Sequence, residues 1–265
     1  MARVAVVGHV EWVDFIELER MPREGEVLGA RDAFARAAGG GAVVAVVLAE
    51  LGADVEFFTV LGDDLHGRAA AEQLRERGVE VHVAWRADRP TRRAVTLLGA
   101  GERTILTVGE RLDPRGADEL PWDRLGGADG VYFTSGDAGA LEHSRRARHL
   151  VASPRGRSAL EHGPRVDALV YSARDADECD WARRLNGRSR LLIETRGIEG
   201  GVWMGESRGR WDAVPASAPV RDPYGCGDAF AAGFTLGLAS GATTAEAAAI
   251  GARAGARCLS RPGAP

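Results

Sequence analysis

Short apolar runs alternate along this chain with longer segments whose apolar positions recur at helical spacing. Runs such as 3–10, 54–62 and 166–172 are rich in Val, Leu and Phe, which is typical of buried parallel strands. Segments such as 63–78 carry Ala and Leu between charged residues and close on a glycine, a pattern that predicts helices. Strands that alternate with helices in this way favour an α/β chain with a mostly parallel sheet and helices on both faces.

The alternation extends over nearly the whole sequence, with two departures. Strands are expected at 3–10, 54–62, 79–85, 130–136, 166–172 and 189–197, helices at 39–52, 63–78, 138–152, 173–187, 226–240 and 243–259, and a hairpin at 201–206 and 209–214. The segments 11–35 and 92–108 instead mix polar and apolar residues in alternation, the second with a hairpin turn at Gly99–Gly101. These two segments predict exposed strands of a small lid, and we interpret 1–265 as a single domain that includes it.

Composition and charge narrow the function classes. The chain has 265 residues, of which 45% are hydrophobic, enough for a substantial core. A formal net charge of -4 provides no basic field for nucleic acid and no polybasic anchor for a membrane. No apolar run approaches the ~20 residues of a membrane span, and acidic residues follow the N-terminus too soon for a signal peptide. We therefore expect a cytoplasmic protein that acts on a small molecule.

The cysteine and lysine counts exclude several chemistries. Three scattered cysteines, Cys179, Cys226 and Cys258, argue against a disulfide framework or a zinc site. The sequence contains no lysine at all, so its 34 basic residues are all arginines. A P-loop and a Schiff-base lysine are both excluded, since each needs that side chain.

A glycine-rich turn precedes the helix expected at 226–240. Gly225, Cys226 and Gly227 can direct successive backbone N–H groups at one point, and the helix N-terminus adds a positive dipole end. Such a turn suits a phosphate. Asp228 in the same turn could accept a proton from an attacking hydroxyl, or it could simply cap the helix; the spacing alone leaves both roles open.

Five motifs together resemble the pfkB family of ribokinase-like carbohydrate kinases. The stretch "DPYGCGDAFAAGF" is similar to the family's C-terminal signature, with Pro223 in place of the usual Thr and Cys226 in place of the usual Ala. The N-terminal signature resembles "AGGGAVVAVVLAELG". The remaining matches are "LGDDLHG", "ETRGIEGG" and, in weakened form, "YSARDADE". All five follow the family's order over nearly the whole chain.

The resemblance implies a fold and a reaction. It implies a three-layer α/β/α ribokinase-like fold with a β-lid, and transfer of the γ-phosphoryl group of ATP to a hydroxyl with the help of Mg²⁺. Asp228 would be the general base, and Gly225, Cys226, Gly227 and Asp228 would form the anion hole. The nucleotide would meet Thr195, Gly197, Gly200 and Asp222. Asp175 would act indirectly on Mg²⁺, although it is shorter than the family's Glu. A monovalent cation is a further candidate cofactor that the sequence leaves open.

The acceptor site departs from the family pattern. The resemblance places Gly39, Gly40 and Gly41 at the substrate, but Val43 replaces an Asn of many relatives and cannot bond a hydroxyl. After the first strand, ribokinases read Asn-x-Asp where this chain reads Glu-Trp-Val-Asp. Glu11 and Asp14 are therefore the polar candidates for holding the substrate, with a solvated carboxylate as the competing interpretation. Ribose is not indicated.

Three alternatives accompany the sugar-kinase hypothesis. The stretch "PTRRAVTLL" resembles the lid strand of phosphosugar kinases, in which an arginine at the position of Arg92 meets the substrate's phosphate; Ala94 replaces the Asn of that motif. A non-catalytic relative that senses a sugar or nucleotide would explain Val43, Ser172 and Asp175. A nicotinamide-dependent dehydrogenase would need Gly-x-Gly-x-x-Gly after the first strand, and "VVGHVEWV" lacks it.

The lid also suggests an oligomer. Its strands would expose one apolar face unless they close over substrate or pair with a second copy. We expect a homodimer through the lid, on the evidence of "EWVDFIEL" and "RAVTLLGA".

Overall fold

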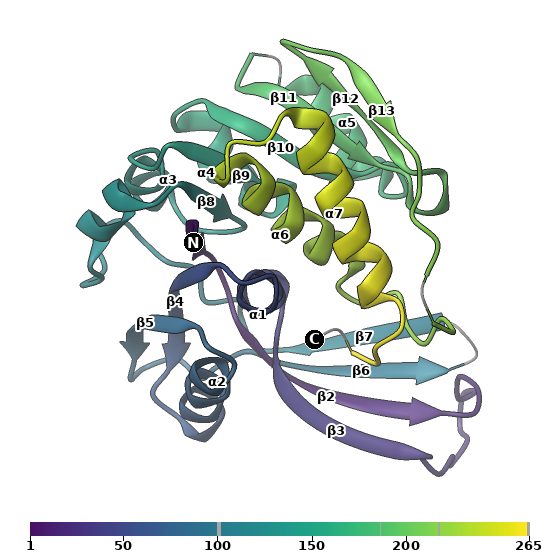
Figure 1. Ribbon diagram of the computed structural model, residues 1–265. Coiled ribbons are helices and arrows are strands. Elements are labelled where there is room, and N and C mark those ends of the chain that lie inside the picture. The colour runs from purple at the N-terminus through teal and green to yellow at the C-terminus, as the bar shows by residue number, and fades with distance from the viewer. Residues whose placement is uncertain (100–101, 186, 217, 264–265) are drawn as a thin grey trace.

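A large, mostly parallel sheet forms the centre of the molecule in a computed structural model, which describes residues 1–99, 102–185, 187–216 and 218–263 (Figure 1). The sheet has nine strands in the order β13-β12-β11-β10-β9-β8-β1-β4-β5. Their bounds are β1 Arg3–Val7, β4 Asp54–Gly62, β5 Glu80–Arg86, β8 Gly130–Phe133, β9 His149–Ala152, β10 Val166–Ser172, β11 Ser189–Thr195, β12 Gly201–Gly205 and β13 Gly209–Trp211. The strands from β5 to β11 in this order are parallel, whereas β12 is antiparallel to β11 and β13 is antiparallel to β12.

Helices cover both faces of this sheet. They are α1 Gly40–Glu50, α2 Leu65–Glu76, α3 Ala138–Ser144, α4 Arg157–His162, α5 Ala176–Arg184, α6 Cys226–Ala239 and α7 Thr244–Cys258, with 3₁₀ turns η1 Trp122–Gly127, η2 Pro154–Gly156 and η3 Gly197–Glu199. Strand β1 shows the layering, because Val4 and Val6 pack in one hydrophobic cluster with α1, α2, α6 and α7, whereas Ala5 and Val7 pack in the other with α3, α4 and α5. The predicted three-layer α/β/α architecture is confirmed.

A second sheet of four strands forms the lid. Its strands are β2 Glu11–Leu18, β3 Asp32–Ala38, β6 Arg93–Gly99 and β7 Glu102–Val108, in the order β3-β2-β6-β7. Figure 1 shows these strands lying side by side beneath α1 and α7. Val13 and Phe15 on the inner face are buried with Ala94 and Leu98, and Tyr224 packs against them from the core. The lid predicted from 11–35 and 92–108 is therefore present; the turn residues 100 and 101 lie outside the described residues.

One predicted helix is wrong in its second half. The helix expected over 138–152 ends at Ser144, and 149–152 form the central strand β9. The Oγ of Ser144 donates to the carbonyl of Ala140 at 2.8 Å, and a turn follows. Leu150, Val151 and Ala152 form an apolar run too short for its periodicity to distinguish helix from strand, and pairing with β8 and β10 decides the outcome. This error matters because β9 ends at the carboxyl edge of the sheet, where ligands of open α/β sheets bind.

None of the helices within the described ranges is long and apolar enough to cross a membrane.

Candidate active site

Several loops meet where the parallel strands end at their carboxyl edge. The segments that follow β1, β8, β9, β10 and β11 all leave the sheet at this edge, because the strands share one direction. The N-termini of α1 and α6 and the inner face of the lid approach the same region, since Tyr224 contacts both Phe15 of the lid and the N–H of Gly39. Ligands of open α/β sheets bind at this edge, so the predicted site residues can be assessed here.

The glycine turn before α6 has the conformation that an anion hole needs. Gly225 is the N-cap of α6 and adopts a left-handed conformation with φ 72°, which is costly for other residues. Among the residues that the structure describes, no side chain caps α6, so the first N–H groups of this helix are not satisfied by a side chain. A Cβ added at Gly227 would meet nothing within 4 Å, so packing does not require a glycine there. The turn therefore offers backbone donors beside open space.

Asp228 lies in the first turn of α6 and is paired with an arginine. Its Oδ1 accepts a hydrogen bond from Nη1 of Arg155 at 2.7 Å, and 11% of its side chain is exposed. The simple helix-cap role is not what the structure shows, because Gly225 is the N-cap and has no side chain. Asp228 is therefore a nearly buried carboxylate that is paired with the guanidinium of Arg155.

Sequence reasoning missed Arg155. Arg155 follows β9 in the turn η2, which starts at Pro154. The sequence analysis predicted a helix over 138–152 and no strand there, so nothing indicated that the next residues reach the carboxyl edge of the sheet. The signal was available in "HLVASPRG", where an apolar run is followed by Ser-Pro, an unlikely continuation of a helix. A Cβ on Gly40 would lie 2.9 Å from Arg155 Nη1, so the guanidinium connects the two glycine turns.

His9 organises the N-terminus of α1. Its Nε2 faces the N–H of Gly40 at 3.4 Å and its Nδ1 the Oγ of Ser135 at 3.2 Å. Burial and then the charges of Arg111, Arg155 and Arg92 lower the pKa of His9 well below its ordinary value. The imidazole is therefore neutral at pH 7, so Nε2 accepts from Gly40 while Nδ1 donates to Ser135. It is a fixed support of the glycine turn.

The three glycines predicted to bind substrate differ in their surroundings. Gly39 has φ 85° and lies against His9 and Glu11. Gly40 lies beneath Arg155. Gly41 is instead required by packing, because a Cβ there would meet the carbonyl of His9 and the ring of Phe57, each at 2.7 Å. Of these three glycines, Gly39 and Gly40 therefore border the region between Asp228 and the lid.

The two lid carboxylates lie on opposite faces of β2. Glu11 shares the inner face with Val13 and lies 3.3 Å from Nη1 of Arg92, and burial raises its pKa. Asp14 points to the outer face and pairs with Arg93 at 2.9 Å. The structure thus brings Glu11 and Arg92 together at the site, and we do not carry Asp14 forward as a substrate ligand.

Three arginines from three parts of the chain converge on the region between Asp228 and the lid, which we call the acceptor region. Arg92 comes from the lid, Arg111 from the segment after the lid, and Arg155 from the end of β9, and all three act electrostatically on both His9 and Glu11. Nη2 of Arg111 donates to the carbonyl of Arg155 at 3.3 Å. Nε of Arg92 is buried and has no hydrogen-bond partner within the described part of the chain. The region therefore holds an unused donor among concentrated positive charge.

The predicted nucleotide residues fall into two groups. Gly197 begins the turn η3 and Gly200 directly follows it, with positive φ angles of 62° and 77°, and the turn comes shortly after Thr195 at the end of β11. Ile198 in that turn is 82% exposed, so the loop can receive a ligand. Asp222 is different, because its oxygens accept from the N–H groups of Tyr224 at 2.8 Å and of residue 263 at 2.9 Å. Its carboxylate holds the loop in place and is not free to contact ATP.

The residues expected near Mg²⁺ lie at the start of α5. Asp175 is exposed and caps the helix by accepting from the N–H of Glu178 at 3.0 Å. Glu178 itself accepts from the N–H of Ser172, burial raises its pKa, and it interacts with Arg155. Carboxylate oxygens suit Mg²⁺, which is commonly held by one or two carboxylates and by substrate phosphates. The donor set fits, with Glu178 better directed to the site than the predicted Asp175.

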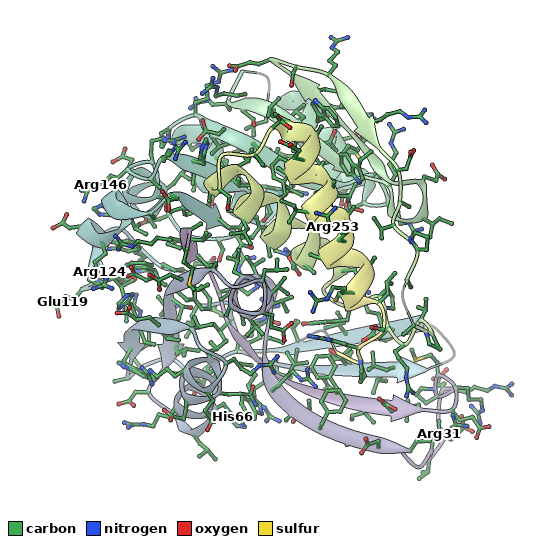
Figure 2. All side chains as sticks on the ribbon, in the orientation of Figure 1. Arg31, His66, Glu119, Arg124, Arg146 and Arg253 are labelled. Atoms are coloured by element: carbon green, nitrogen blue, oxygen red, sulfur yellow. The ribbon has the colours of Figure 1, made fainter. Side chains whose placement is uncertain are left out.

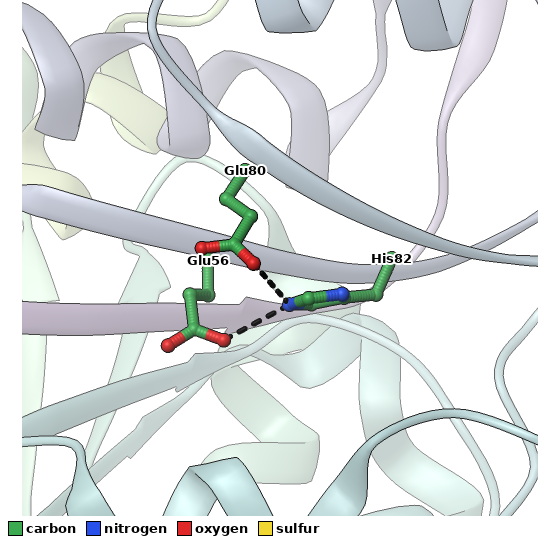
Figure 3. A group of neighbouring side chains, drawn as sticks. All are labelled: Glu56, Glu80 and His82. Carbon is green, nitrogen blue, oxygen red and sulfur yellow. Dashed lines mark hydrogen bonds and ion pairs between the residues drawn. The ribbon is translucent and has the colours of Figure 1, made fainter.

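A separate acidic cluster lies at the opposite edge of the sheet. Glu56, Glu80 and His82 come from the early parts of β4 and β5 and direct their side chains toward one another (Figure 3). Nη2 of Arg124 donates to Glu80 at 3.0 Å, and Nε of Arg124 to Glu56 at 2.5 Å. His82 bonds Glu56 at 2.9 Å. Arg124 pairs with both carboxylates and Arg3 with Glu56 at 3.4 Å, so we interpret the cluster as an ion-pair network at the edge of the sheet.

Comparison with known proteins identifies the family. The model of the pfkB family of carbohydrate kinases matches residues 1–151 and 169–265, so the chain belongs to that family. A ribokinase of Arabidopsis thaliana is 33% identical over 126 residues, which is 46% of this chain and 32% of that protein. The matched segments span less than half the length of the curated relatives that the chain resembles.

Solved structures confirm the fold. The structure of Arabidopsis thaliana ribokinase complexed with ribose and ATP has a TM-score of 0.78 at 22% identity, and the match covers 100% of this chain and 95% of that chain. The ribokinase of Cryptococcus neoformans in complex with ADP has a TM-score of 0.75 at 24% identity, covering 100% and 96%. The ribokinase-like fold and family predicted from the motifs are therefore correct.

Proposed function

We propose that the protein is a kinase that transfers the γ-phosphoryl group of ATP to a hydroxyl of a sugar or sugar-like molecule. The observation that carries this proposal is the position of Asp228, a nearly buried carboxylate in the first turn of an uncapped helix beside a glycine turn. A hydroxyl bound between this turn and the lid would give its proton to Asp228 as it attacks phosphorus. Backbone N–H groups of residues 225–228 would stabilise the charge that develops on the transferred group.

Other residues of the chain support the same step. Arg155 holds the carboxylate of Asp228 in one orientation, and a fixed base is more effective than a mobile one. Gly39 and Glu11 border the acceptor region, and the loop of Thr195, Gly197 and Gly200 receives the nucleotide. Glu178 would hold Mg²⁺ together with the phosphates of ATP. The ion supplies positive charge that neutralises the transferring phosphoryl group.

The test is ADP release with a panel of sugars, nucleosides and sugar phosphates. Asp228→Asn should lower kcat by ~10²–10⁴-fold, because a positioned base contributes that much, and should leave the fold intact. Circular dichroism and a urea titration establish folding. Turnover by this variant at the normal rate would refute the role of the base. A silent wild-type protein that still binds ATP would favour the alternative of a non-catalytic sensor.

A phosphorylated acceptor is the second candidate, and the three convergent arginines favour it. Arg92, Arg111 and Arg155 place positive charge around the acceptor region, and the free Nε of Arg92 could donate to a substrate phosphate. Comparing a sugar with the same sugar carrying a phosphate discriminates the two candidates. If the second is right, Arg92→Ala should raise KM for the phosphosugar at least tenfold and leave KM for ATP unchanged.

We also propose a homodimer through the lid. The outer face of the lid presents Val95 and Leu97 of β6 and the 55%-exposed Leu106 of β7, which the strand register places on one face. Burial of this face against a second copy would remove it from water. Light scattering at micromolar concentration should give a dimer, and Leu106→Asp should give a monomer. A monomeric wild-type protein would contradict this proposal.

A further inference from the structure

The motif "LGDDLHG" spans the end of β4 and the start of α2, beside the segment that leads into the lid strand β6. Gly62 ends β4, Asp64 is the N-cap of α2, and Gly67 lies in the first turn of that helix. Thr91, two residues before β6, is 4% exposed and packs against this motif. The motif therefore contacts one of the chain segments that connect the lid to the core.

The carboxylate of Asp64 joins the two segments. Its Oδ1 accepts from the N–H of Gly67 at 2.8 Å, which caps α2, and its Oδ2 accepts from the N–H of Thr91 at 2.6 Å. The N–H of Gly62 donates in turn to Oγ1 of Thr91 at 3.0 Å. Burial alone would raise the pKa of Asp64, but the hydrogen bonds from Gly67 and Thr91 outweigh burial and lower that pKa. Asp64 is therefore ionised at neutral pH, and hydrogen bonds to a charged acceptor are the stronger kind.

The two glycines of the motif allow this close approach. A Cβ added at Gly62 would lie 2.6 Å from the carbonyl oxygen of Arg89, and one added at Gly67 would lie 2.6 Å from Oγ1 of Thr91. Both distances are too short for a real Cβ, so only glycine fits at these positions while the segment stays in place. We call the arrangement of Gly62, Asp64, Gly67 and Thr91 the Asp64 clamp.

Arg92 directly follows the clamped residue and extends into the acceptor region. The carbonyl oxygen of Arg92 accepts from the N–H of Trp12 at 3.0 Å, and its Nη1 lies 3.3 Å from Glu11. Its Nε is buried and finds no hydrogen-bond partner among the residues that the structure describes. The backbone that carries this guanidinium is thus fixed on one side by Trp12 of the lid and on the other by the Asp64 clamp.

We propose that Asp64 is a positioning residue, which acts through the backbone of Thr91 to hold Arg92 in place for the acceptor. Loss of the Thr91 hydrogen bond releases one of the two anchors, so the donor of Arg92 meets the acceptor in fewer of its conformations. KM for the acceptor should rise, whereas KM for ATP should not, because the loop proposed for the nucleotide follows β11, well separated from β4 in the sheet. The effect on KM rests on the proposed kinase function; the clamp itself does not.

Three variants isolate the hydrogen bond to Thr91. Asp64→Ser keeps a side-chain oxygen that caps α2 and lacks the second oxygen that Thr91 needs. Asp64→Asn keeps the size of the side chain but offers one oxygen to the two N–H groups. Asp63→Asn is the matched control, because Asp63 belongs to the same motif but is exposed and pairs with Arg68 at 2.5 Å. Circular dichroism and a urea titration establish that each variant folds.

Two measurements test the proposal. Amide hydrogen exchange of the peptic peptides that contain Thr91 reports on the clamp without any substrate. ADP release with D-fructose, D-fructose 6-phosphate and adenosine as the panel gives KM for the acceptor and for ATP. In Asp64→Ser we expect Thr91 to exchange about tenfold faster. We also expect KM for the acceptor to rise about fivefold, with KM for ATP changed less than about twofold. Asp63→Asn should change neither measurement.

Arg92→Ala distinguishes positioning from a general structural effect. If Asp64 acts through Arg92, adding Asp64→Ser to Arg92→Ala should raise KM for the acceptor no further. The same rise in both backgrounds, or an unchanged acceptor KM in an active Asp64→Ser, would overturn the positioning role. Unchanged exchange at Thr91 would overturn the clamp. A wild-type protein that releases no ADP with the panel, while Asp64→Ser still speeds exchange at Thr91, would support the clamp and count against the proposed kinase function instead.

Discussion

The ion pair between Arg155 and Asp228 leads to the most informative prediction, in which Arg155→Gln removes the charge and keeps much of the volume. The pair is intermediate in burial, since 11% of the Asp228 side chain and 40% of the Arg155 side chain are exposed. Exposed pairs contribute about 0.2–1 kcal/mol, and breaking a fully buried pair costs about 3–5 kcal/mol. Water screens this guanidinium, so we expect a loss of about 1–2 kcal/mol in the free energy of unfolding.

The same substitution should affect catalysis. Without the 2.7 Å hydrogen bond, the carboxylate of Asp228 is no longer held in one orientation, and we expect kcat to fall by ~10–10²-fold. Urea unfolding and ADP release measure the two effects on one preparation. Arg146→Gln is the matched control, because Arg146 pairs with the fully exposed Asp123 at 2.6 Å, near α3 at the molecular surface (Figure 2). It should change stability by less than about 0.5 kcal/mol. An unchanged kcat in Arg155→Gln would refute the positioning role.

Three further predictions concern neighbouring residues. Gly227→Ala should keep or slightly raise stability, because Ala in a helix is favoured over Gly by up to about 1 kcal/mol and the added Cβ meets nothing within 4 Å. The same variant should lower kcat about tenfold. Normal ADP release would argue against the anion hole. Buried His9 stays neutral in the folded protein, whereas the unfolded state binds a proton at this residue below about pH 6.5. The free energy of unfolding should therefore fall as the pH drops below that value, with a slope approaching about 1.4 kcal/mol per pH unit. His9→Gln should flatten that slope in urea titrations. Glu178→Gln should raise the Mg²⁺ concentration for half-maximal activity several-fold, and an unchanged Mg²⁺ titration would exclude Glu178.

Local signals in the sequence predicted most of the elements. Glycine turns, short apolar runs and helical periodicity each depend on residues close together in the chain, so the strands, the helices and the lid were predicted within a few residues. One exception is 149–152, where a short apolar run was ambiguous and pairing in the sheet decided for a strand. The other is the short helix α4, which the sequence analysis did not predict. The family followed from motif order, and Asp228 and the turn before α6 from one of those motifs.

What the sequence by itself determined is therefore the order of elements, the lid and the family motifs. Tertiary structure alone decided that Arg155 meets Asp228, that Asp14 points away from Glu11, and that the thiol of Cys258 contacts the carbonyl of Tyr224. These contacts join segments far apart in the chain and depend on which strands pair and which helices pack together. Hydrophobic periodicity records which face of an element is buried and does not record what lies against it, so such contacts appear only when the chain is folded.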